Sequence, residues 1–172
     1  MLGDLTEKIQ SSQHKLEELA NKIPGFAGYR AKEQRREADK LLRLHVAEQY
    51  DQLLDRLNRI QYELVTAGDL TGMMLLERGV SRLQLLVDRI RTASYGYAGL
   101  FDAIKVDDEA LDRLYDFDQG MLDGVAALSS SLDAISASVA EGQSVQAAGN
   151  ALMAELERLH RKFGERQQVI LG

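Results

Sequence analysis

The spacing of the apolar residues constrains this chain more than any other feature of its sequence. Along almost the whole length, large apolar side chains recur at alternating steps of three and four residues. Such spacing keeps one stripe of a helix apolar, and it is typical of helices that pack at a shallow angle in bundles and coiled coils. No segment alternates apolar and polar residues as a half-buried strand does. The sequence therefore predicts an all-α fold with coiled-coil-like packing.

Five segments carry this pattern, and they are separated by residues that stop helices, such as Pro24-Gly25. The expected helices cover approximately residues 4–23, 30–66, 71–95, 107–141 and 144–170. The apolar residues that define the stripes, here called the seam residues, are, in chain order, Leu2, Leu5, Ile9, Leu16, Leu19, Ile23, Val46, Tyr50, Leu53, Leu57, Ile60, Leu64, Met73, Leu76, Val80, Leu83, Val87, Ile90, Leu111, Leu114, Met121, Val125, Leu128, Leu132, Ile135, Val139, Val145, Leu152, Leu156, Leu159 and Phe163.

The connections between these segments are short, and short connections make consecutive helices antiparallel. Additional apolar residues beside the seams, such as Leu54 and Leu86, widen the stripes beyond what a two-stranded coil needs. A chain of 172 residues fits one domain. We therefore predict that residues 1–172 form a single domain, an up-down antiparallel bundle of four to five long helices.

The composition argues against several functions. The chain has no cysteine, which excludes disulfides, thiolate metal sites and cysteine nucleophiles. Its net charge of -6 argues against a general nucleic-acid binder, because phosphate neutralisation needs clustered Lys and Arg. No apolar run approaches the roughly 20 residues of a membrane span. The N-terminus shows no secretory signal, so we expect a cytoplasmic protein, and contact with a membrane surface is only weakly supported.

Glycines and aromatic residues occur together in two connections, near residues 23–30 and 94–101. The antiparallel order places both connections at one end of the bundle, here called the lower end. One interpretation is that the aromatic side chains close the core at this end. The other is that they form a site for a peptide or a helix of a partner. The candidate aromatic residues are Phe26, Tyr29, Tyr95, Tyr97 and Phe101.

Residues 30–45, at the same end, hold six basic side chains and three acidic ones. Basic residues at a helix N-terminus oppose the helix dipole, so something should offset their charge. The acidic segment 102–123 is one candidate for this role. The other is an external anion, such as a phosphate, a lipid headgroup or an acidic partner, bound by Arg30, Arg35 and Arg36.

Asp118 interrupts the seam of its segment between Leu114 and Met121. A buried carboxylate is costly without a partner, so we expect an arginine or tyrosine of a neighbouring helix beside it. A polar seam residue commonly fixes the register of the helices, and a functional carboxylate in a cavity is the alternative. Gly120 and Gly124 leave room nearby for close helix approach or a small void.

Signals for metal binding and catalysis are weak. Di-metal bundles use two Glu-x-x-His pairs, and this chain has one, Glu157 and His160. His160 lies beside the seam, so we interpret it as a solvated histidine. The sequence has no phosphate-binding glycine loop, nucleophile elbow or zinc-binding helix motif. We therefore expect no catalytic residue, no metal and no cofactor.

Three hypotheses for function follow. The first is a non-enzymatic bundle that acts through protein contacts, with a protein partner or by self-association, as a scaffold, adaptor or assembly subunit. The second is a module that binds an anionic ligand or a lipid headgroup at the basic and aromatic lower end. The third is a metal protein that uses the carboxylates Asp118 and Glu157.

Overall fold

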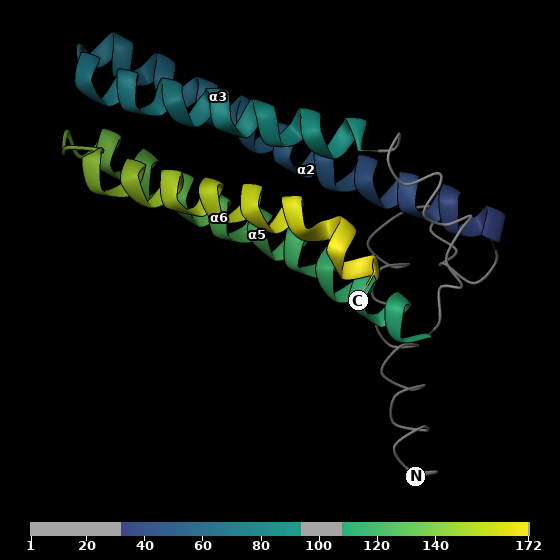
Figure 1. Cartoon of the computed structure of the whole chain (residues 1–172). Coiled ribbons are helices and arrows are strands. Elements are labelled where there is room, and N and C mark those ends of the chain that lie inside the picture. Colours follow the sequence, from purple (N-terminus) through teal and green to yellow (C-terminus); the bar gives the residue numbers. More distant parts are fainter. Residues whose placement is uncertain (1–31, 94–107, 172) are drawn as a thin grey trace.

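The computed structural model describes residues 32–93 and 108–171, and these residues form four helices and no strand (Figure 1). The helices are α2 (Lys32–Ala67), α3 (Leu70–Thr92), α5 (Asp108–Ala140) and α6 (Gln146–Leu171). The helices pack against one another, which confirms the all-α bundle. Their ends lie within three residues of the limits expected from the sequence. The expected helix over residues 4–23 lies outside the described residues.

Two tight turns join the helices in pairs. Between α2 and α3, Gly68 has a φ of 79°, a left-handed conformation that favours glycine. Asp69 then caps α3, because its carboxylate accepts a hydrogen bond of 2.8 Å from the backbone N–H of Gly72. Gly142 has a φ of 65° in the second turn, and the Ser144 hydroxyl accepts from the N–H of Gln146 at 3.3 Å. Each pair is therefore an antiparallel helical hairpin.

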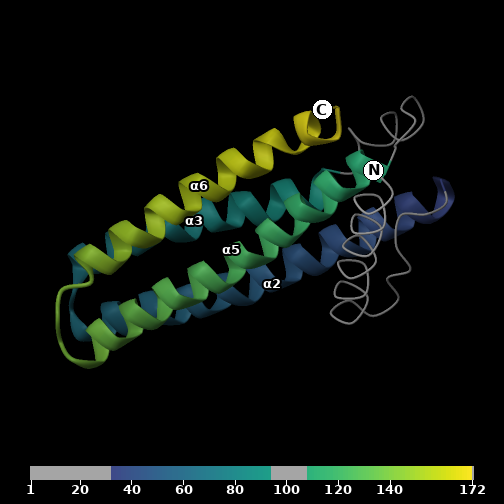
Figure 2. The same cartoon turned by 90° about the horizontal axis from the view of Figure 1, so that it is seen from below.

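The two hairpins lie against each other in two layers, with α2 beside α5 and α3 beside α6 (Figures 1 and 2). Along α2, Tyr50 contacts Met121 and Arg56 contacts Ser129, so α2 and α5 run in the same direction. The glycines of α3 show the same relation to α6, since Gly72 faces Val145, just before α6, and Gly79 faces Leu152. Consecutive helices alternate in direction as expected, but the neighbours between the layers are parallel.

Among the described residues, one apolar core lies between the layers. Every predicted seam residue of α2 and α6 is buried. In α3 and α5, Met73, Val80, Val125 and Val139 are half-buried against the same core. The stripes of the four described helices therefore face one another, as the sequence pattern predicts.

Two glycines allow the layers to approach closely. A Cβ atom at Gly124 would lie 2.6 Å from the Tyr50 hydroxyl oxygen and closer still to Leu159. At Gly149 the same atom would lie 2.5 Å from Leu75 Cδ2. Real side chains do not tolerate such separations without movement of a neighbour. These positions therefore set how tightly the core can pack.

Within the described part of the chain, no helix combines the length and the apolar character needed to cross a membrane.

Candidate functional site

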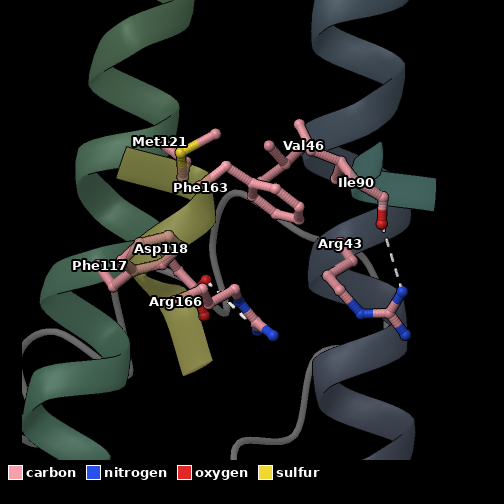
Figure 3. A pocket seen from close by; sticks show the side chains of 8 residues that line it. All are labelled: Arg43, Val46, Ile90, Phe117, Asp118, Met121, Phe163 and Arg166. Carbon is pink, nitrogen blue, oxygen red and sulfur yellow. Dashed lines mark hydrogen bonds and ion pairs between the residues drawn. The ribbon is translucent and has the colours of Figure 1, made fainter. Parts of the chain in front are cut away.

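A cluster of charged residues is buried where the lower ends of the described helices meet (Figure 3). Asp118 of α5 and Arg166 of α6 form an ion pair, with 3.6 Å between Oδ1 and Nη2. Their side chains are 5% and 1% exposed, so the pair is almost completely removed from water. The expectation that Asp118 has an arginine partner on a neighbouring helix is therefore confirmed.

Neighbouring groups add to this pair. The guanidinium of Arg166 lies 5.9 Å from the centre of the Phe117 ring, and the Lys162 ammonium lies 5.8 Å from the same centre. Both distances suit attraction between a cation and an aromatic ring. Lys162 passes over Gly120, where a Cβ atom would collide with it. At Gly120 the room that the sequence predicts is therefore occupied by a lysine side chain.

Arg43 reaches the same region from α2, and its side chain is buried. Its Nη1 atom donates long hydrogen bonds to the carbonyl oxygens of Ile90 and Arg91, at 3.4 and 3.5 Å. These carbonyls belong to the last turn of α3. The carbonyl groups of a last turn have no hydrogen-bond partner within their helix, and the helix dipole favours a positive charge beside them. This member of the basic segment 30–45 therefore faces the helix end of its own molecule.

The cavity between these residues is small. It has a volume of about 10 Å³ and is lined by Arg43, Asp118 and Arg166 together with five apolar residues, Val46, Ile90, Phe117, Met121 and Phe163. A volume of this size holds about one water molecule, and a water needs two to four polar partners. The cavity is too small for a phosphate or a lipid headgroup. In the described part of the charged cluster, Asp118, Arg166 and Arg43 each contact a neighbouring helix.

Most of the other predicted site residues fall outside the described part of the chain. Arg35 and Arg36 lie in the first turns of α2, but their side chains are not among those described. The remaining residues of the predicted site outside the described range are Phe26, Tyr29, Arg30, Tyr95, Tyr97 and Phe101. Their grouping at the lower end stays a prediction.

Tyr50 is a buried polar residue whose role the seam pattern did not reveal. Its hydroxyl donates a hydrogen bond of 2.6 Å to the carbonyl oxygen of Met121 and so joins α2 to α5. Burial raises the pKa of this hydroxyl above its ordinary value of 10.0, and the nearby Glu155 carboxylate raises it further. Tyr50 is therefore protonated at neutral pH and acts as a hydrogen-bond donor within the core.

The sequence pattern predicts that His160 is a solvated histidine. In the structure it is half-buried and joins two helices. Its Nδ1 atom lies 2.9 Å from Nη1 of Arg89 and accepts from it, while Nε2 donates to the carbonyl oxygen of Arg82 at 2.8 Å. Both ring nitrogens are therefore used within the protein. Among the residues that the structure describes, no three His, Asp or Glu side chains come together as metal ligands would.

A second candidate site lies on the surface of α3. Leu70, Met74 and Leu85 are more than half exposed, at 62%, 63% and 54%. At 100° per residue they lie with Ser81 within an arc of about 60°, opposite the buried side of the helix. We call these four residues the outer face of α3. Tyr62, on the adjacent helix α2, is 74% exposed.

The fold places the chain in the class of all-α helical bundles, with a buried ion pair between two of its helices. The chain matches no protein-family model, and no curated protein or solved structure is significantly similar to it.

Proposed function

We propose that this protein is a non-enzymatic helical bundle that works through protein contacts, as a scaffold, adaptor or assembly subunit. The observation that carries the proposal is the outer face of α3, where three large apolar side chains are exposed along one side of a helix. Apolar surface of this kind, bordered by polar residues, is typical of sites that another protein covers.

The interior of the bundle supports the same proposal. The buried polar side chains of Asp118, Arg166 and Tyr50 interact with groups of neighbouring helices. The cavity beside the ion pair has room for about one water molecule. These polar groups join neighbouring helices, and the exposed apolar side chains of α3 remain as the surface for recognition.

Photo-cross-linking in cells tests this proposal. A benzoylphenylalanine placed at Met74 should form covalent adducts heavier than the chain alone, because this side chain projects from the outer face of α3. The matched control is the same group at Ala151, an exposed residue of α6. Adducts from Met74 and none from Ala151 support the proposal. No adduct from Met74, or equal labelling from both positions, contradicts it.

A further inference from the structure

The outer face of α3 has a charged residue on each of its two edges. Glu77 and Arg78 lie just outside the arc of the apolar residues, on opposite sides of it. Both are exposed, and neither forms an ion pair or a side-chain hydrogen bond with the described residues. From Leu70 to Leu85 the face therefore presents an apolar stripe with one acidic edge and one basic edge. The exposed Asp88 lies at the same angle just beyond Leu85, where its carboxylate accepts a hydrogen bond of 3.1 Å from Nε2 of Gln84.

The charges of Glu77 and Arg78 are complementary between two copies of this face only when the two helices are parallel. When two identical helices pair in parallel, each edge of one helix faces the opposite edge of the other. Glu77 of each copy would then face Arg78 of the other copy. In an antiparallel pair each edge faces itself, so glutamate would meet glutamate and arginine would meet arginine, which is unfavourable.

We infer that the outer face of α3 binds the same face of a second copy, with the two α3 helices side by side and parallel. Leu70, Met74 and Leu85 each meet the same residue of the second copy, and Ser81 allows close approach at the middle of the stripe. The inference rests on the proposed function and names the partner of that site.

The contact is expected to be weak. The stripe from Leu70 to Leu85 extends about 23 Å along the helix, at 1.5 Å per residue. A contact between two helices of this length buries less surface than the interfaces of stable dimers, so we expect a reversible dimer with a Kd of about 10–100 µM.

Disulfide cross-linking of the purified full chain tests the orientation, and the absence of natural cysteines makes the experiment clean. In a parallel dimer, the single variants Met74→Cys and Leu85→Cys should each form an interchain disulfide on oxidation at about 100 µM protein. The control Ala151→Cys, on the exposed side of α6, should form little. Cross-linking only in a mixture of Met74→Cys and Ser81→Cys chains would show an antiparallel pair and overturn the inference.

Exchange of the charges at positions 77 and 78 tests whether Glu77 of one copy faces Arg78 of the other. Glu77→Arg and Arg78→Glu should each weaken the dimer about three- to tenfold in sedimentation equilibrium, because each single variant places like charges opposite each other. The double variant exchanges both charges, restores opposite signs across the contact and should return the Kd to near that of the wild type. A double variant that dimerises no better than the single variants would contradict the inference.

The experiments distinguish failure of the proposed function from failure of the inference that a second copy is the partner. If purified cysteine variants give no interchain disulfide while photo-cross-linking from Met74 in cells gives adducts with a different protein, the second copy is not the partner and the proposed function stands. If neither experiment gives a product from the outer face of α3, both proposals are wrong.

Discussion

At the scale of single residues, the ion pair between Asp118 and Arg166 lies in the core and is almost completely removed from water. Removal of the carboxylate alone takes from the guanidinium beside Phe117 its ion-pair partner on α5. Replacement of both residues by apolar side chains of similar size removes the charge and its desolvation cost together. The single and double changes should therefore have very different consequences.

We predict that Asp118→Leu lowers the free energy of unfolding by about 3–5 kcal/mol. The double variant Asp118→Leu/Arg166→Met should recover at least half of this loss. Urea denaturation followed by circular dichroism measures both values. A surface pair provides the control: Asp51→Asn removes the partner of Arg91, and both of these side chains are well exposed, so its cost should stay below about 1 kcal/mol. A double variant no more stable than Asp118→Leu would contradict this interpretation.

Tyr50 predicts a dependence of stability on alkaline pH. Its pKa is raised in the folded protein by burial, whereas an unfolded tyrosine loses its proton near pH 10. The unfolded state therefore releases a proton that the folded state retains, and stability is lost as the pH rises above about 10. We expect the wild type to lose stability faster than Tyr50→Phe between pH 9 and pH 11. Urea denaturation at several pH values measures the free energy of unfolding of both proteins. If this free energy falls equally with pH in the wild type and in Tyr50→Phe, the hydroxyl is not buried.

At the scale of the helices, two glycines in helix interiors, Gly124 buried and Gly164 exposed, should respond to alanine in opposite ways. Gly124→Ala places a methyl group against Leu159 and the Tyr50 hydroxyl, so we expect a loss of about 1–3 kcal/mol in spite of the higher helix propensity of alanine. At Gly164 the nearest atom is Arg89 Nη2, at 3.6 Å, which is an ordinary contact. Gly164→Ala should therefore gain up to about 1 kcal/mol. Thermal unfolding of both variants measures the contrast, and two changes of the same sign would contradict it.

The helices could be predicted from the sequence because burial repeats at the spacing of their apolar residues. The charged cluster was only partly predicted. Asp118 was found as a break in the seam, but Arg43 and Arg166 continue the seams of their own helices, three residues before Val46 and three residues after Phe163. A search for charged residues at seam positions would have found all three members. Which helix holds each partner depends on packing between distant segments.

The outer face of α3 shows a different limit of sequence reasoning. Met73, Met74, Leu75 and Leu76 are consecutive apolar residues, and one helix cannot bury four neighbours on one side. The structure buries Leu75 and Leu76, half-buries Met73 and exposes Met74. The spacing indicates that one of these residues is exposed, but only the positions of α2 and α6 decide which one.

At the scale of the whole molecule, the two hairpins form two layers whose exposed side chains differ. The layer formed by α2 and α3 exposes large apolar side chains, including Tyr62 and the outer face of α3. The exposed side of α5 carries small residues such as Ala127, Ser130, Ala134 and Ala137. A dimer through α3 therefore leaves the α5–α6 layer of each copy free for another contact.

Sedimentation equilibrium of the purified chain tests the central claim most directly. The wild type is compared with a variant in which Leu70, Met74 and Leu85 are all replaced by serine, changes that leave the core intact because these side chains are exposed. We predict a reversible monomer–dimer equilibrium for the wild type and a monomer for the variant, with the same helical content by circular dichroism. Identical association of the two proteins, as monomers or as dimers, would show that the outer face of α3 is not a contact surface between copies.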